Sequence, residues 1–168
     1  KSRCRVNPMR AVRAITFDLD DTLWEIGPVI ERAERRVYEE IRNRFPRVAG
    51  RYDVDGIKRT RQQVLEKHPE VAHDLTEIRR VTFNWMLAEC GYDPDDSHVL
   101  LETFLQFRHE VEFFSDVMPA LRRLSERYPL LTMTNGNADV ERLGITQFFA
   151  GHISASSAGI LKPDPRIF

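Results

Sequence analysis

A short apolar run that ends in closely spaced carboxylates constrains this chain more than any other feature. Residues 12–17 read Val-Arg-Ala-Ile-Thr-Phe, and residues 18–22 continue as Asp-Leu-Asp-Asp-Thr. Because the run is too short for a helix and too apolar for a surface loop, it predicts a strand buried on both faces, as in a parallel sheet. Ligands of open α/β sheets bind beyond the carboxyl ends of the strands, which is where these acids fall.

The three acids Asp18, Asp20 and Asp21 need compensation, because neighbouring carboxylates repel one another and resist desolvation. A divalent cation supplies it, and Mg²⁺ prefers one or two carboxylates together with the oxygens of a bound phosphate. The alternative is an acidic surface loop without a function. We therefore expect a site for Mg²⁺ and phosphate directly after the first strand.

Composition excludes several classes of function. Of the 168 residues, 42% are hydrophobic and 30% are charged, which is typical of a soluble globular protein. The net charge of -1 gives no reason to expect binding to nucleic acid or to a membrane surface. No apolar run is long enough to span a bilayer. Cys4 and Cys90 are far apart and lack metal-ligand spacing, which favours a reducing cytoplasm.

Both ends of the sequence indicate a portion of a longer chain. It opens on Lys1 instead of methionine, and it stops at Phe168, shortly after Pro165 marks the expected start of a helix. Residues 1–11 are basic and without periodicity, so we expect them to form a loosely ordered lead-in.

Four amphipathic helices are predicted after the first strand, because apolar residues recur at steps of three and four. Pro28 suits the first position of the first helix, and Asp55 and Asp74 are candidate N-caps of the second and third. The fourth helix opens at residues 94–95. Consecutive helices with short connections favour an antiparallel bundle.

The α/β pattern resumes after this insertion. Residues 117–128 predict a helix, residues 130–134 a second buried strand and residues 152–155 a third strand, and another helix is expected to begin at residues 137–139. Residues 134–136, Thr-Asn-Gly, stand at the tip of the second strand. A hydroxyl and backbone N–H groups can reach a phosphoryl oxygen there, and glycine allows the backbone to approach closely.

Three short motifs resemble, in chain order, those of the haloacid dehalogenase (HAD) superfamily: Asp18-Leu-Asp-Asp-Thr22, Thr134-Asn-Gly136, and Lys162 ahead of Pro163. The resemblance implies a Rossmann-like, three-layer α/β core of residues 1–25 and 111–168, truncated after the third motif. It also implies that residues 26–110 form a four-helix-bundle cap of the C1 type, which closes over the site and excludes water. The alternative is a helical subdomain without a gating role.

By the same resemblance, Asp18 is the nucleophile that forms an aspartyl-phosphate, and it binds Mg²⁺ through its carboxylate. Asp20 is the general acid and base, and it binds Mg²⁺ through its backbone carbonyl. A carboxylate nucleophile divides one difficult displacement into two easier ones, and one tuned acid can serve both proton transfers. Dehalogenases of the superfamily lack an acid at this place, because a halide leaves without a proton, so Asp20 implies phosphate esters.

The other two motifs are implied to bind the phosphoryl group. Thr134, with the backbone of Asn135 and Gly136, would hold its oxygens, and Lys162 would offset the repulsion between Asp18 and the phosphate. Alone, Thr134-Asn-Gly136 is an ordinary turn and Lys162 is a solvated surface charge. Their order in the chain favours the functional interpretation.

The fourth HAD motif, whose acids complete the Mg²⁺ site, is absent from the sequence. Asp164 is the one late carboxylate, and it belongs to the lysine motif. We therefore expect the first strand to be an open sheet edge, and the 168 residues alone to be neither fully active nor comfortably soluble.

Residues 28–30, 73–76 and 134–138 are similar to those of bacterial phosphatases that act on FMN and on the ribityl-pyrimidine phosphate of riboflavin synthesis. The resemblance implies a Mg²⁺-dependent phosphomonoester hydrolase of small phosphorylated metabolites, such as FMN, nucleotide or sugar phosphates, in a cytoplasmic monomer or homodimer. Trp24 and His73 are candidate substrate contacts. A phosphotransferase or mutase, and a catalytically incomplete protein with a binding role, are the alternatives.

Overall fold

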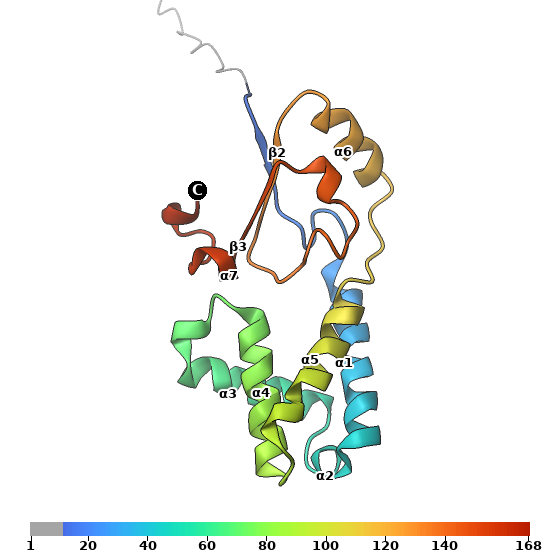
Figure 1. Ribbon diagram of the computed structural model, residues 1–168, viewed down its shortest axis with the longest axis vertical. Coiled ribbons are helices and arrows are strands. Elements are labelled where there is room, and N and C mark those ends of the chain that lie inside the picture. The colour runs from blue at the N-terminus through green and yellow to red at the C-terminus, as the bar shows by residue number, and fades with distance from the viewer. Residues whose placement is uncertain (1–11) are drawn as a thin grey trace, which may run out of the picture.

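The computed structural model describes residues 12–168, so the predictions for residues 1–11, including Cys4, lie outside the described residues. Figure 1 shows the arrangement: the helices α1 to α5 gather at one end of the molecule, and the strands and α6 lie at the other. The fold is an α/β fold with a parallel sheet and mostly helical content.

The sheet has three strands, β1 (Ile15–Phe17), β2 (Leu130–Thr134) and β3 (Gly151–Ser154), in the order β1-β2-β3. All are parallel, with Ile15 opposite Leu130 and Leu131 opposite Gly151. Their carboxyl ends therefore lie at one edge of the sheet, where ligands of such sheets bind.

The prediction of a first strand buried on both faces over residues 12–17 is wrong. The strand begins at Ile15, Val12 is 60% exposed, and Thr16 is exposed while its neighbours are half-buried. Within residues 12–168, β1 pairs with β2 on one side and lies at the sheet edge, as expected. An edge strand that packs on one face needs apolar residues at alternate positions, which Ile15 and Phe17 supply.

The helical part comprises α1 (Ile26–Arg44), α2 (Pro46–Ala49), α3 (Val54–Lys67), α4 (Leu75–Glu89) and α5 (Ser97–Arg108), with 3-10 turns at η1 (Pro69–Val71) and η2 (Pro94–Asp96). Helix α5 packs against both α1 and α4, and α3 packs against α4. These contacts enclose a hydrophobic core of the helical part itself, which includes Ala33, Val37, Ile41, Ile57, Phe83, Met86, Leu87, Leu100 and Phe104.

Helix starts differ from the predictions by a few residues. Helix α1 begins at Ile26, so Pro28 is in the first turn but not at its first position. The N-cap of α3 is Asp53, whose carboxylate accepts a hydrogen bond from the Gly56 N–H at 2.6 Å, whereas Asp55 lies inside the helix. Positions 53 and 55 both carry an aspartate near the start of α3, and the sequence pattern alone does not decide which carboxylate bonds to the backbone.

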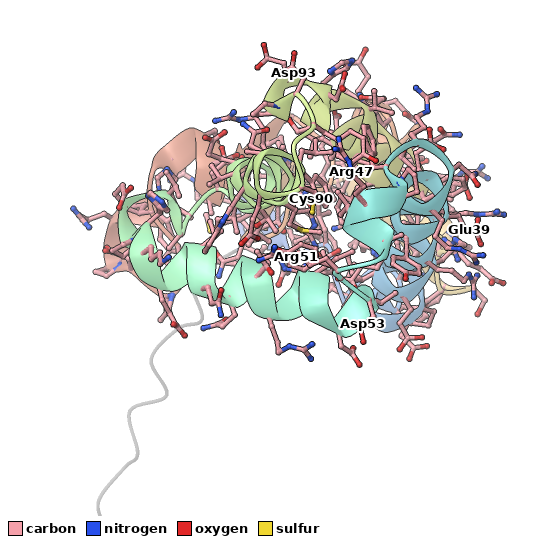
Figure 2. All side chains as sticks on the ribbon, turned by 90° about the horizontal axis from the view of Figure 1, so that it is seen from below. Glu39, Arg47, Arg51, Asp53, Cys90 and Asp93 are labelled. Carbon is pink, nitrogen blue, oxygen red and sulfur yellow. The ribbon has the colours of Figure 1, made fainter. Side chains whose placement is uncertain are left out.

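The predicted N-cap of α4 is confirmed. The Asp74 carboxylate accepts hydrogen bonds from the N–H groups of Thr76 and Glu77, both at 3.0 Å. The helix ends where Gly91 takes a φ of 70°, a left-handed conformation that glycine adopts without strain. Cys90, just before this turn, points between the helices, while Asp53 and Asp93 point outward from the same end of the molecule (Figure 2).

The chain after the helical part returns to the sheet through α6 (Val117–Ser125) and continues past β2 with η3 (Thr146–Phe148), α7 (Ala155–Ala158) and η4 (Pro165–Ile167). The helix predicted to begin at residues 137–139 does not form. Instead the Asp139 carboxylate accepts from the Glu141 N–H at 2.8 Å and closes a turn, a local bond that competes with helix formation.

Two connections join the helical part to the sheet, and they run side by side. Trp24 and Phe113 form an antiparallel bridge, and the Phe114 N–H donates to the Leu23 carbonyl at 3.0 Å. A second hydrophobic core lies here and under the strands, and it includes Leu19, Leu23, Trp24, Val117, Leu121, Leu130 and Ile145. Among residues 12–168, none of the helices has the length and apolarity that a membrane crossing requires.

Candidate active site

The loop after β1 separates its acids by one buried residue. Leu19 is fully buried in the core, while Asp18 is exposed and Asp20 is half-buried. Asp21 takes a φ of 58°, and its N–H donates to the Trp24 carbonyl at 2.9 Å, which turns the chain sharply toward α1. Aspartate is among the few residues that adopt this conformation readily. The turn therefore fixes where the two preceding acids lie.

Asp18 and Lys162 form an ion pair across the carboxyl edge of the sheet. The Lys162 Nζ lies 2.9 Å from Asp18 Oδ1, and it also donates to the Met133 carbonyl at 2.7 Å. The Leu19 N–H donates to the same Asp18 oxygen at 2.9 Å. The Asp18 side chain is 45% exposed, and its Oδ2 accepts no hydrogen bond from residues 12–168. One carboxylate oxygen is therefore held, and the other faces the solvent side.

The Asn135 side chain makes a contact that the sequence did not reveal. Its side-chain Nδ2 donates to the Lys162 carbonyl at 3.0 Å, and its Oδ1 accepts from the Lys162 N–H at 2.7 Å. These two bonds fasten the loop that carries the lysine to the loop after β2. The structure thus brings the three sequence motifs together, with Asn135 contributing its side chain to the loop.

Gly136 lies against Asp20. A Cβ at this position would come within 3.0 Å of Asp20 Oδ2, closer than real Cβ atoms approach such an atom. The Gly136 N–H donates to the Thr134 hydroxyl at 2.9 Å, so Thr134 is the hydrogen-bond partner of this backbone group in the structure. Glycine is needed here because the backbone and the carboxylate are in close contact.

Asp20 is paired with an arginine that the sequence analysis did not single out. The Arg108 Nη2 lies 2.7 Å from Oδ1 and 2.9 Å from Oδ2 of Asp20, and Arg108 is 1% exposed. Burial raises the pKa of Asp20 above its usual value, and the Arg108 guanidinium opposes that rise. A carboxyl group with a raised pKa suits proton transfer near neutral pH.

A periodic signal in the sequence points to Arg108. On α5 the fully buried residues Leu100 and Phe104 are four positions apart, and Arg108 is the next residue at that spacing. An arginine at the end of an amphipathic helix is usually solvated, so this spacing alone does not predict a buried Arg108.

The two proposed substrate contacts differ in placement. Trp24 is 0% exposed and packs edge-on against Phe113, with ring centroids 5.8 Å apart. The structure therefore puts Trp24 in the core and not on a surface that a substrate could reach, because its ring covers the bridge between the two connections. His73 is half-buried in the turn before α4, and its contact with substrate stays a prediction.

The donor set fits a partial Mg²⁺ site. Within residues 12–168 no group of three or more His, Cys, Asp and Glu side chains is placed to hold a metal ion. Mg²⁺ commonly uses only one or two carboxylates and keeps several waters, and the unoccupied Asp18 Oδ2 suits this role. Because Arg108 occupies the Asp20 carboxylate, any ligation by Asp20 falls to its backbone carbonyl.

Comparison with known proteins shows which family has a similar sequence. Residues 12–168 match the model of a hydrolase family described as haloacid dehalogenase-like hydrolase. The chain is 31% identical over 160 residues to the 5-amino-6-(5-phospho-D-ribitylamino)uracil phosphatase YigB of Escherichia coli, covering 93% of this chain and 67% of that protein. It is 26% identical to the glyceraldehyde 3-phosphate phosphatase of Methanopyrus kandleri, covering 94% of this chain and 67% of that protein.

Among solved structures, a 2-haloacid dehalogenase from Pseudomonas syringae pv. Tomato DC3000 is similar, with a TM-score of 0.86 and 37% identity. The match covers 94% of this chain and 70% of the dehalogenase. The chain therefore spans roughly two thirds of the length of the relatives it matches.

Proposed function

The chain belongs to the haloacid dehalogenase-like hydrolases, and from this premise we propose that it is a Mg²⁺-dependent phosphomonoesterase that forms an aspartyl-phosphate on Asp18. One observation carries the proposal: an exposed carboxylate paired with Lys162 lies in the same loop as a second carboxyl group, Asp20, that is half-buried and has a raised pKa. A nucleophile and an acid with different surroundings are what a two-step displacement requires.

In the first step, the free Oδ2 of Asp18 attacks the phosphorus atom and the bond from phosphorus to the ester oxygen breaks. Asp20 gives its proton to that oxygen, so that the product leaves as a neutral alcohol. Lys162 offsets the repulsion between Asp18 and the incoming phosphate. The Thr134 hydroxyl and the backbone N–H groups of Asn135 and Gly136 are proposed to bind the phosphoryl oxygens, for which the Gly136 N–H exchanges its bond to Thr134 for one to the phosphate.

In the second step, a water molecule attacks the phosphorus of the aspartyl-phosphate. Asp20, now ionised, takes a proton from that water as the bond from phosphorus to Asp18 breaks, which releases inorganic phosphate and regenerates both carboxyl groups. The Asp18 carboxylate and the Asp20 backbone carbonyl would hold Mg²⁺, which would supply positive charge to offset that of the phosphoryl group.

Residues 26–110 are proposed to act as a cap over this site. Two observations support this role: the helices have a separate hydrophobic core, and two adjacent connections join them to the sheet. Contacts from Arg108 on α5 and Thr76 on α4 also reach the loops that carry Asp20 and Asn137. Closure of such a cap would exclude water and contact the part of the substrate that does not react.

The proposed substrates are small phosphorylated metabolites. The relatives named above act, by their names, on a ribityl-aminouracil phosphate and on glyceraldehyde 3-phosphate, so ribityl-pyrimidine phosphate, FMN, and nucleotide and sugar phosphates are the first compounds to assay. We further propose a cytoplasmic monomer or homodimer without nucleic-acid or membrane partners, on the basis of the near-neutral charge and of Cys90, which forms no disulfide within residues 12–168.

A direct experiment tests this function. Release of inorganic phosphate from the panel is measured with Mg²⁺ and with EDTA, for the wild type and for Asp18→Asn. We expect turnover that needs Mg²⁺ and Asp18, together with phosphorylated protein that hydroxylamine cleaves, as an acyl phosphate should. Phosphate release without any hydroxylamine-labile adduct in rapid-quench samples would contradict the covalent route.

The same assay separates the alternatives. Transfer of phosphate to an added sugar or alcohol in preference to water indicates a phosphotransferase. Substrate binding without turnover indicates a catalytically incomplete protein. Because a 2-haloacid dehalogenase has a similar structure, release of chloride from 2-chloropropionate is measured in parallel. We expect none, because Asp20 is an acid suited to an ester oxygen.

A further inference from the structure

Arg108 is the last residue of α5, yet it is buried and faces the loop after β1. One nitrogen of its guanidinium, Nη2, donates to both oxygens of Asp20, at 2.7 and 2.9 Å. Gly136 also lies against this carboxylate and leaves no room even for a methyl group. The Asp20 carboxylate is therefore held between an arginine of the helical part and the backbone of the loop after β2.

Further bonds from Arg108 continue toward a second helix. Its Nε donates to Asn137 Oδ1 at 3.2 Å, and Asn137 Nδ2 donates to the Thr76 hydroxyl in the first turn of α4 at 3.1 Å. The guanidinium carbon also lies 5.9 Å from the centre of the Trp24 ring. Arg108 thus connects α5, the catalytic loop, the loop after β2 and α4 in one place.

Stability alone is a weak reason for this arrangement. Replacing a buried ion pair with apolar residues of similar volume is often neutral or stabilising, and Arg108 continues a face of α5 whose previous members are Leu100 and Phe104. Within residues 12–168, its Nη1 is also buried without a hydrogen-bond partner. Burying Arg108 requires its charge to be desolvated, and this burial is better explained by the group that Arg108 orients, the Asp20 carboxylate.

We propose that Arg108 is the positioning residue for Asp20: it fixes the acid/base carboxylate from the helical part, so that Asp20 is placed for proton transfer only when α4 and α5 lie against the loops. This inference deepens the proposed phosphatase function and rests on it. Arg108 acts through Asp20 and need not touch the phosphoryl group.

Leaving-group dependence tests the proposal. Proton donation matters for an alkyl phosphate, whose leaving group is a poor one, and matters little for p-nitrophenyl phosphate. We expect Arg108→Met to lower kcat/KM for the alkyl ester by about 10²-fold, the size of a lost acid contribution, and for the nitrophenyl ester by less than about 10-fold. Arg108→Lys, which keeps the charge without the two-oxygen contact, should fall between wild type and Arg108→Met.

A double-mutant cycle adds a readout that a structural role would not move. In the Asp20→Asn background, Arg108→Met should cause little further loss, because two residues that act as one unit are not additive. Arg142→Met is the matched control: Arg142 is an exposed arginine paired with Glu102 at 3.2 Å, and its loss should change neither ester. Equal losses for both esters, or full additivity with Asp20→Asn, would overturn the proposal.

One further variant and one further measurement keep the test decisive. If Arg108→Met does not fold, Asn137→Ala removes the bond to the guanidinium together with the bond to Thr76 and keeps Arg108 itself. It should still affect the alkyl ester more than the nitrophenyl ester; equal effects would overturn the proposal. If the wild type hydrolyses no phosphate ester, the proposed function fails by itself. The Arg108–Asp20 contact is then tested by melting temperature, which should fall less for Arg108→Met in the Asp20→Asn background than in the wild type; equal falls would refute the coupling.

Discussion

Two buried arginines, one at the junction of the two parts and one inside the helical part, have opposite surroundings. Arg108 at the junction has both oxygens of a carboxylate within 2.9 Å. Arg79 on α4 stacks on the Phe104 ring at 3.8 Å and donates to the Leu75 carbonyl at 3.4 Å. Burial lowers the pKa of Arg79 to about 9, and the positive charge of Arg61 acts in the same direction.

The difference separates a buried charge that contacts a proposed catalytic group from one that does not. At the junction, the buried Arg108 pairs with Asp20, which belongs to a sequence motif. Inside the helical part, Arg79 borders a cavity of about 10 Å³, next to the ion pair between Arg61 and Glu34 at 3.0 Å, and no carboxylate in residues 12–168 pairs with it. The comparison predicts that charges of the loops control the reaction rate, whereas Arg79 bears on the stability of the helices.

The largest expected effect is that of Asp18→Asn. An amide is not a nucleophile toward phosphorus, so turnover should fall by at least about 10³-fold, as for a lost nucleophile. The melting temperature should change little, because the Asp18 side chain is 45% exposed. Retained turnover would remove Asp18 as the nucleophile, and a large loss of stability would break the contrast between loops and helices.

Asp20→Asn comes next. An asparagine still accepts a hydrogen bond from Arg108 but cannot transfer the proton, so turnover should fall by roughly 10²-fold, the usual contribution of acid–base catalysis. Rates of the wild type and the variant are compared from pH 5 to pH 9. A variant as fast as the wild type throughout that range would exclude the proposed role.

Gly136→Ala sharpens the comparison without changing any charge. The new Cβ must displace the Asp20 carboxylate, so we expect kcat to fall by about 10-fold, a loss typical of a misplaced catalytic group. Gly27→Ala, in α1, is the matched control, because a Cβ there meets nothing within 4 Å. Similar losses in both variants would show that the effect of Gly136→Ala is general and not directed at Asp20.

Arg79→Met tests the other side of the comparison. The variant loses the contact with the Phe104 ring but no longer buries a charge, so the free energy of unfolding should stay level or rise by up to about 2 kcal/mol. Activity should stay within about two-fold of the wild type. Denaturant unfolding and phosphate release measure the two quantities. A folded but inactive variant would place Arg79 in the site and break the comparison.

The smallest expected effect concerns His109, beside Arg108. Burial lowers its pKa, with Arg108 adding to the effect, while its Nε2 accepts a hydrogen bond from the Asp139 N–H at 2.9 Å. Because the unfolded chain binds a proton at higher pH than the folded one, His109 costs stability as the pH falls below about 6.5. The melting temperature should therefore fall between pH 7.5 and pH 5.5, and His109→Gln should lessen that fall.

Local patterns predicted the parts of this protein that local chemistry decides. The Asp74 cap follows from residue type and position. The Asp18, Thr134 and Lys162 motifs were found because they end predicted strands or follow one another in a known order. The start of α3 was missed because Asp53 and Asp55 are equally suited to cap a helix, and only the fold selects one.

What the sequence did not reveal depends on contacts between distant segments. Arg108 is an ordinary terminal arginine until α5 is placed beside the loop after β1. Trp24 was assigned to the substrate because it follows the catalytic loop, but the bridge to Phe113 buries it. The first strand was expected to be buried on both faces because its residues are apolar, yet the face that carries Thr16 is exposed. In each case, tertiary position overrode local composition.

The bond between Asp20 and Arg108 joins residues 88 positions apart. Closing so long a loop carries an entropic penalty and is favoured only after the intervening helices have formed. In a newly made or partly unfolded chain, Asp20 would therefore lack the contact with Arg108. If the proposed function holds, such a chain would hydrolyse alkyl phosphates slowly until the helical insertion had folded.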